Sequence, residues 1–140
     1  NSVLGEVLQE NMDSIKRYGY TDEEMRFALE LSKTCGGQKL DIDSYLGSYD
    51  KARRKEITAL LEPFCTKPVN DFVLPLKDQE ICLMASSDVG DVSWNCPCAA
   101  LSAVTWPAGV KPHTWQAVAS GKSSFAKKGM LYAGKVMAGH

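Results

Sequence analysis

The chain has 140 residues, of which 44% are hydrophobic and 24% charged, as is ordinary for one globular domain or part of a larger one. Its net charge of −1 predicts no broad attraction to nucleic acid or anionic membranes, and no apolar run approaches the roughly 20 residues that span a bilayer. Five cysteines, an odd number, argue against a disulfide framework and favour reduced thiols in a cytoplasmic protein.

The N-terminal part of the chain is expected to form two helices. Apolar residues three or four apart over 3–18 predict the first helix. Thr21 and Glu24 form a capping box, which predicts a second helix over 21–34. The chain begins without a methionine, and both of its ends fall in helix-like apolar patterns. We therefore expect a fragment whose partners in the fold are missing.

The middle of the chain has a weaker pattern. Residues 37–49 show little periodicity and predict a loop, and a third helix is expected over 49–61. Residues 71–76 are expected to be extended, although Pro75 permits only an edge strand or no strand there.

Two apolar runs predict β-strands in the second half. Residues 81–85 are typical of a strand buried on both faces, and residues 99–106 favour a second strand. A loop over 107–112 and a last helix over 123–137 follow. The mixture of helices and strands predicts an α/β fold with an incomplete sheet, which again suggests a fragment.

A polar turn follows the first predicted strand at residues 86–94. Ligands of open α/β sheets bind outside the carboxyl ends of the strands, so this turn is expected at the rim of a site. Asp88 and Asp91 could cap a helix or bind a ligand, and their positions alone leave both readings open. Gly90 leaves room for close approach of a backbone.

His113 follows a loop that contains Pro and Gly, and we expect it to form the second wall of that site. By spacing alone, a single histidine is more often a surface or hydrogen-bonded residue than a metal ligand. No second His or Cys lies nearby at metal-ligand spacing, so a complete zinc site within this chain is not predicted. Cys96 and Cys98 are separated by one residue rather than the two of redox motifs, and are interpreted as packing residues.

Three stretches together resemble one family. They are SSDVGDVSW at 86–94, GVKPHTWQAV at 109–118 and GKSSFAKKGMLYAGKV at 121–136. They are similar to the C-terminal part of the M20 metallopeptidase and amidohydrolase family, in particular its aminobenzoyl-glutamate hydrolase branch. The resemblance covers residues 1–36 and 80–137, whereas 37–79 matches little and is interpreted as a variable insertion of loop and helix.

The resemblance implies the C-terminal portion of an M20 catalytic domain, a partial three-layer α/β/α fold with a mixed sheet and without its lid domain. It implies a hydrolase that uses two divalent metal ions, Zn or Mn, to cleave an amide bond of an N-acyl amino acid or an aminobenzoyl-glutamate-like substrate. By this resemblance His113 matches the last metal ligand, and Ser86, Ser87 and Asp88 match a turn that binds substrate. The other ligands and a general-base Glu would lie upstream, so the isolated chain is expected to be inactive and to hold no metal.

The chain also departs from that branch. Lys127 stands where the branch usually has His, and 85–87 reads Ala-Ser-Ser where it usually has Gly-Ser-Thr, which leaves the substrate open. The parent protein is expected to be cytoplasmic and to form a homodimer or hetero-oligomer through the lid domain. The alternatives are a non-catalytic α/β interaction or regulatory domain, in which His113 is solvated, and a small redox protein that uses Cys96 and Cys98.

Overall fold

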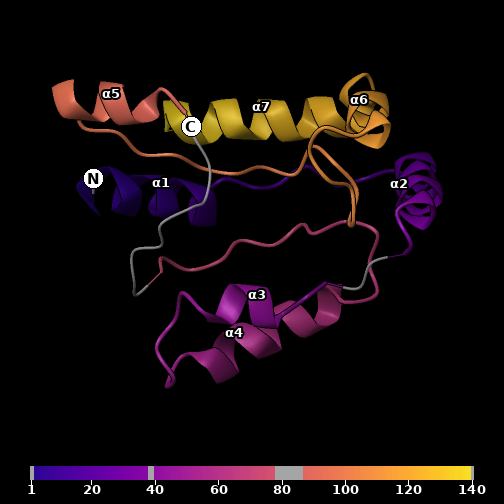
Figure 1. The fold of residues 1–140 in the computed structure, drawn as a ribbon, viewed down its shortest axis with the longest axis horizontal. Helices are drawn as coiled ribbons and strands as arrows, with labels where there is room; N and C mark the ends of the chain where they lie inside the picture. The colour runs from indigo at the N-terminus through magenta and orange to yellow at the C-terminus, as the bar shows by residue number, and fades with distance from the viewer. Residues whose placement is uncertain (1, 38–39, 78–86, 140) are drawn as a thin grey trace.

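The computed structural model describes residues 2–37, 40–77 and 87–139. In chain order, its elements are α1 (Ser2–Ser14), α2 (Asp22–Thr34), α3 (Asp43–Leu46), α4 (Arg54–Leu61), the 3-10 helix η1 (Glu62–Phe64), α5 (Val89–Asn95), α6 (Trp115–Gly121) and α7 (Ser124–Ala138). Figure 1 shows α5, α7 and α6 in one row along the top, with α1 just below that row. Helices α3 and α4 lie at the bottom of the view. None of the described helices has the length and apolar character needed to cross a membrane.

The helices with clear capping signals form where the sequence predicts them. The Thr21 side chain accepts from the Glu24 N–H at 3.3 Å, and Glu24 Oε2 accepts from the Thr21 N–H at 2.8 Å, so the predicted capping box begins α2. Ser123 caps α7 in the same way, accepting from the Ala126 N–H at 3.2 Å. The first helix ends at Ser14, four residues before its predicted end at 18.

The predicted α/β fold with a mixed sheet is wrong, since the described residues contain no β-strand. Residues 71–76 and 99–106 run as long irregular segments between the helices (Figure 1). A strand requires repeated backbone N–H···O=C hydrogen bonds with a neighbouring strand. Next to these two segments there is instead an isolated backbone hydrogen bond, from the Ala108 N–H to the Pro68 carbonyl at 2.7 Å. The other predicted strand, 81–85, lies outside the described residues.

One hydrophobic cluster joins α2 to α7. Ala28 and Phe125 are fully buried in it, and Val69 is 2% exposed. Tyr20, which precedes α2, stacks on Phe125 with ring centroids 4.9 Å apart. This cluster fixes α2 against the N-terminal half of α7.

A second cluster lies within the segment 37–79. Its buried members, Tyr49, Ile57 and Leu61, pack around α4 and are covered in part by Phe72. The Tyr49 hydroxyl also donates to the Pro75 carbonyl at 2.7 Å. The segment that lacked the family resemblance therefore has a small helical core of its own.

Helix α7 touches the segment 99–106 through Gly129. A Cβ atom added at Gly129 would lie 1.9 Å from the carbonyl oxygen of Val104, so only glycine allows this approach. Met130, Leu131 and Met137 of the same helix are exposed.

Candidate functional site

The loop that leads to His113 is anchored at Ala108. The Ala108 N–H donates to the Pro68 carbonyl at 2.7 Å, and its carbonyl accepts from Ser32 Oγ at 2.8 Å. Both Ala108 and Ser32 are buried. Gly109 follows with a φ of 86°, which turns the chain outward.

His113 ends this loop at an exposed position, directly before the residue that caps α6. Its backbone is left-handed, with a φ of 61°. In the described part of the chain, His113 is the one residue other than glycine that has a positive φ. Such a backbone costs roughly 1–2 kcal/mol for a residue with a Cβ. Within the described residues, the ring makes no hydrogen bond or ion pair, so both of its nitrogens are available to a ligand.

Thr114 closes the turn around His113. Thr114 Oγ1 donates to the Lys111 carbonyl at 2.8 Å and accepts from the Ala117 N–H at 3.4 Å. The same hydroxyl thus caps α6 and holds the loop in place. Sequence reasoning missed Thr114, although a Thr three residues before an N–H of an apolar helix is a recognisable capping signal.

The polar turn lies at the start of α5. Ser87 and Asp88 are exposed, and Asp88 occupies the N-cap position without a side-chain capping bond. Asp91 is exposed in the first turn of α5. Ser86, the third residue of the predicted substrate-binding turn, lies outside the described residues. The Asp88 side chain therefore does not cap the helix, and its carboxylate is open to a ligand.

The structure does not bring the polar turn and His113 together. Helices α5 and α6 lie at opposite ends of α7 (Figure 1), and His113 comes two residues before α6 whereas Asp88 precedes α5. In the described ranges no group of three His, Cys, Asp or Glu side chains is placed to hold a metal ion. His113 thus fits the role of one ligand of a metal site and does not make such a site by itself.

A shallow groove runs beside the His113 loop. It has a volume of about 400 Å³ and is lined by Asn70 and by residues 102–110, which is in the size range of small-molecule sites. The Oδ1 atom of Asn70 is buried and has no hydrogen-bond partner among the described residues. The sequence predicted a strand at residues 99–106 and did not predict a groove there.

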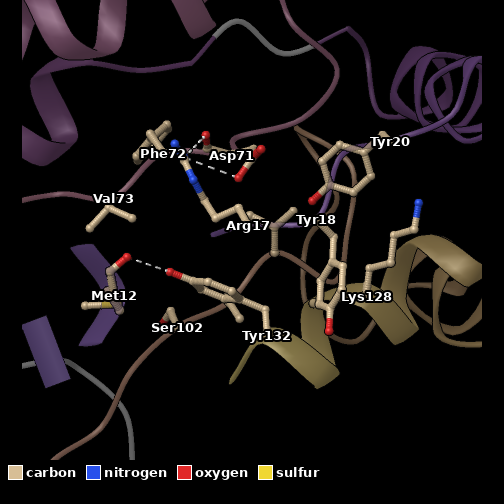
Figure 2. Close-up of a pocket in the computed structure, with 13 residues that line it drawn as sticks. Met12, Arg17, Tyr18, Tyr20, Asp71, Phe72, Val73, Ser102, Lys128 and Tyr132 are labelled. Atoms are coloured by element: carbon tan, nitrogen blue, oxygen red, sulfur yellow. Dashed lines mark hydrogen bonds and ion pairs between the residues drawn. The ribbon is translucent and has the colours of Figure 1, made fainter. Parts of the chain in front are cut away.

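A more enclosed cavity lies between the end of α1, α7 and the two irregular segments (Figure 2). At about 40 Å³ it has room for one or two water molecules. Arg17 pairs with Asp71 across it at 3.4 Å, and the Tyr132 hydroxyl donates to the Met12 carbonyl at 3.0 Å. Burial, together with the Asp71 and Glu24 carboxylates, raises the pKa of Tyr20 to about 12. Polar contacts of the residues that line this cavity thus join segments that are far apart in the chain.

A partly buried ion pair links α2 to α7 next to this cavity. Lys128 Nζ lies 2.6 Å from Glu24 Oε2 and also donates to the Gly19 carbonyl at 2.8 Å. Ser124 donates to Glu24 Oε1 at 2.7 Å. Burial alone would raise the pKa of Glu24, but the hydrogen bonds from Lys128, Ser124 and the Thr21 N–H outweigh it and lower the pKa from 4.5 to about 2.

We expect the free energy of unfolding to fall as the pH decreases from 4.5 toward 2. A carboxyl group with a lowered folded-state pKa stabilises the fold above its unfolded pKa, and this contribution is lost as the pH falls through the folded value. For Glu24 it amounts to about 3 kcal/mol at neutral pH. Denaturant unfolding between pH 2 and 7 should show that Glu24→Gln removes this acid dependence and that the exposed neighbour Glu23→Gln keeps it. The same acid dependence in both variants would contradict the assignment.

The thiol pair near α5 has no sign of redox activation. The Cys98 Sγ donates to the Cys96 carbonyl at 3.4 Å. Burial and the neighbouring Cys96 thiol raise the pKa of Cys98, whereas a reactive thiol needs a lowered pKa. The redox alternative therefore loses its physical support.

A comparison with known proteins finds a relative that is 47% identical over 66 residues, a subunit of the p-aminobenzoyl-glutamate hydrolase of Escherichia coli (strain K12). The matched residues make up 47% of this chain and 14% of the relative, so the match spans about a seventh of its length. No protein-family profile and no solved structure matches the chain. The resemblance to the aminobenzoyl-glutamate hydrolase branch is confirmed by this relative.

Proposed function

We propose that this chain is part of an amidohydrolase that cleaves the amide bond of p-aminobenzoyl-glutamate or a similar N-acyl amino acid. The observation that carries the proposal is the 47% identity over 66 residues to a relative named as a hydrolase of p-aminobenzoyl-glutamate. Identity at this level over 66 residues supports a shared local structure, and the name of the relative supports the reaction class for the longer protein that carries this chain.

His113 is proposed as one ligand of a pair of divalent metal ions, Zn or Mn. Its imidazole is exposed and has no partner within the described residues, and neutral imidazole is a good ligand for either metal. When bound, such ions polarise the amide carbonyl and lower the pKa of a bound water. The other ligands would come from elsewhere in the protein, because the described ranges of this chain contain no group of three or more His, Cys, Asp or Glu side chains that could hold a metal ion.

Ser86, Ser87 and Asp88 are proposed to bind the substrate. In support of this role, Ser87 and Asp88 are exposed, and their side chains make no hydrogen bond within the described residues. A hydroxyl group and a carboxylate are suited to the amine and amide groups of an aminobenzoyl-glutamate-like molecule. Since α5 and α6 lie at opposite ends of α7 (Figure 1), the turn and His113 would contact different parts of the bound molecule or of the assembled protein.

The relative is named as a subunit, and we propose that the protein that carries this chain also assembles with another subunit in the cytoplasm. The exposed apolar side chains of α7, Met130, Leu131 and Met137, are compatible with burial in such an assembly.

The test is hydrolysis of p-aminobenzoyl-glutamate by the full-length protein before and after metal removal. We expect release of p-aminobenzoate to stop when a chelator removes the bound metal and to return when Zn²⁺ or Mn²⁺ is added, because the proposed activity needs the metal ions that His113 would help to hold. The 140-residue chain alone is expected to give no turnover. Hydrolysis that survives complete metal removal, or that the isolated chain performs, would overturn the proposal. Full-length protein without any hydrolysis of N-acyl amino acids would favour an interaction module instead.

A further inference from the structure

The thiols of Cys96 and Cys98 are not part of the hydrophobic core. Cys96 is exposed and Cys98 is half-buried, and neither belongs to the cluster around Phe125 or to the one around Tyr49. Free cysteines are normally among the most buried residues of a protein. The interpretation of this pair as packing residues therefore does not account for their position, and their chemistry has to be considered instead.

The chain folds back on itself at these two residues. It bends at Cys96, directly after α5, and the proline between the two cysteines restricts the backbone. Within this bend the Cys98 Sγ donates to the Cys96 carbonyl at 3.4 Å and also hydrogen-bonds to the Cys96 side chain. The two thiols are thus in contact in the folded chain before any reaction takes place.

The Cys96 side chain is free to move closer to Cys98. Its thiol donates to the Val92 carbonyl at 3.6 Å, and a thiol is a weak hydrogen-bond donor. A disulfide requires sulfur atoms about 2 Å apart. Rotation of an exposed side chain that gives up one weak bond can bring the sulfur atoms from contact to this distance.

The pair lacks the reactivity of a redox catalyst but has the chemistry of an oxidation site. Desolvation and the neighbouring Cys96 thiol raise the pKa of Cys98, so exchange with other disulfides is slow near neutral pH. In strongly oxidising dithiols a stabilised thiolate favours the reduced form. Cys98 has no such stabilised thiolate, so a disulfide between the two cysteines is not driven back to the dithiol once it has formed.

We propose that Cys96 and Cys98 are a site of reversible oxidation, at which a hydroperoxide converts the two thiols into one intramolecular disulfide. The exposed Cys96 reacts first: its thiolate attacks a peroxide oxygen, the O–O bond breaks, and the hydroxide that leaves takes up a proton to form water. The Cys98 thiolate then attacks the sulfur of the sulfenic acid, the S–S bond forms, and the hydroxyl group leaves as a second water. The two thiols lose two protons and two electrons, and one hydrogen peroxide is reduced to two waters.

The experiment treats the full-length protein with hydrogen peroxide at neutral pH, alkylates the remaining thiols and maps them by mass spectrometry. Chymotrypsin cuts after aromatic residues and leucine, so the peptide of residues 95–101 contains both cysteines of the pair and no other. Cys35 and Cys65 are matched internal controls. Like Cys96, each donates its thiol hydrogen to the carbonyl four residues earlier, at 3.7 and 3.9 Å, but neither has a second cysteine within two residues.

We expect the peptide 95–101 to lose two hydrogen atoms and to take up no alkylating reagent, at a peroxide dose that leaves Cys35 and Cys65 fully alkylated. Dithiothreitol should restore both thiols, and Cys96→Ser and Cys98→Ser should each abolish the product. The reaction should also speed up as the pH rises, because the thiolate is the attacking species. A peptide 95–101 that stays fully alkylated while Cys35 or Cys65 is oxidised would overturn the proposal. So would added oxygen atoms or an intermolecular disulfide in place of the internal one.

Discussion

Replacing Gly129 with alanine is expected to lower the free energy of unfolding by about 3 kcal/mol or more, at the upper end of overpacking effects. The added Cβ would lie 1.9 Å from the carbonyl oxygen of Val104 and 2.8 Å from its carbonyl carbon. Both are backbone atoms, so no side-chain rotation can relieve the contact. Either α7 or the segment 99–106 must shift, and a shift of α7 would disturb the cluster around Phe125 and the Glu24–Lys128 ion pair.

Gly134→Ala is the matched control on the same helix. Nothing lies within 4 Å of a Cβ added at Gly134, so the substitution should stabilise α7 by roughly 0.5–1 kcal/mol through helix propensity alone. Urea unfolding of the two variants at neutral pH measures the difference. Equal stabilities for Gly129→Ala and Gly134→Ala would show that α7 does not pack against Val104 as described.

In the full-length protein, replacing His113 with alanine is expected to lower the hydrolysis of p-aminobenzoyl-glutamate by about 10³-fold or more, and to remove one bound metal ion per chain. Loss of a residue that hydrogen-bonds to a metal ligand typically lowers metal affinity or activity by about 10- to 100-fold, and loss of the ligand itself should lower them further. Turnover under saturating substrate and metal content by elemental analysis are the two measurements.

His113→Gly separates loss of the ligand from damage to the fold. Glycine adopts a φ of 61° without strain, so this variant should be as stable as the wild type or more stable by about 1 kcal/mol. It should nevertheless lose metal and activity to the same extent as His113→Ala. Unchanged metal content and turnover in both variants would remove His113 from the proposed site.

The sequence predicted those parts of the fold whose causes are local. The capping box of Thr21 and Glu24 depends on residues three apart, and it is present as expected. The sequence also placed α7 correctly, because its apolar spacing and the Ser123 cap lie within one helix. The short helices α3 and α6, of four and seven residues, were not anticipated, since they are too short to show a helical period. A helix at the position of α5 was one of the two readings of the polar turn at 86–94.

The strand at 99–106 was mispredicted because pairing is not a local property. Residues 99–106 are apolar and run irregularly, yet their contacts are side-chain and close backbone packing against α7 rather than a ladder. The sequence also did not predict the left-handed backbone of His113, because histidine adopts a positive φ much less often than glycine does. The pairing of Lys128 with Glu24 joins residues far apart in the chain, and only the packing of α7 on α2 brings them together.

The contact at Gly129 also limits how the protein can move. If α7 slid by one turn in either direction, Phe125 or Ala133 would face the Val104 carbonyl. Both residues carry a Cβ atom, for which there is no space beside that carbonyl. A slide of α7 by one turn along the segment 99–106 is therefore blocked in both directions. As long as the two elements stay in contact, Gly129 fixes the position of α7 along that segment.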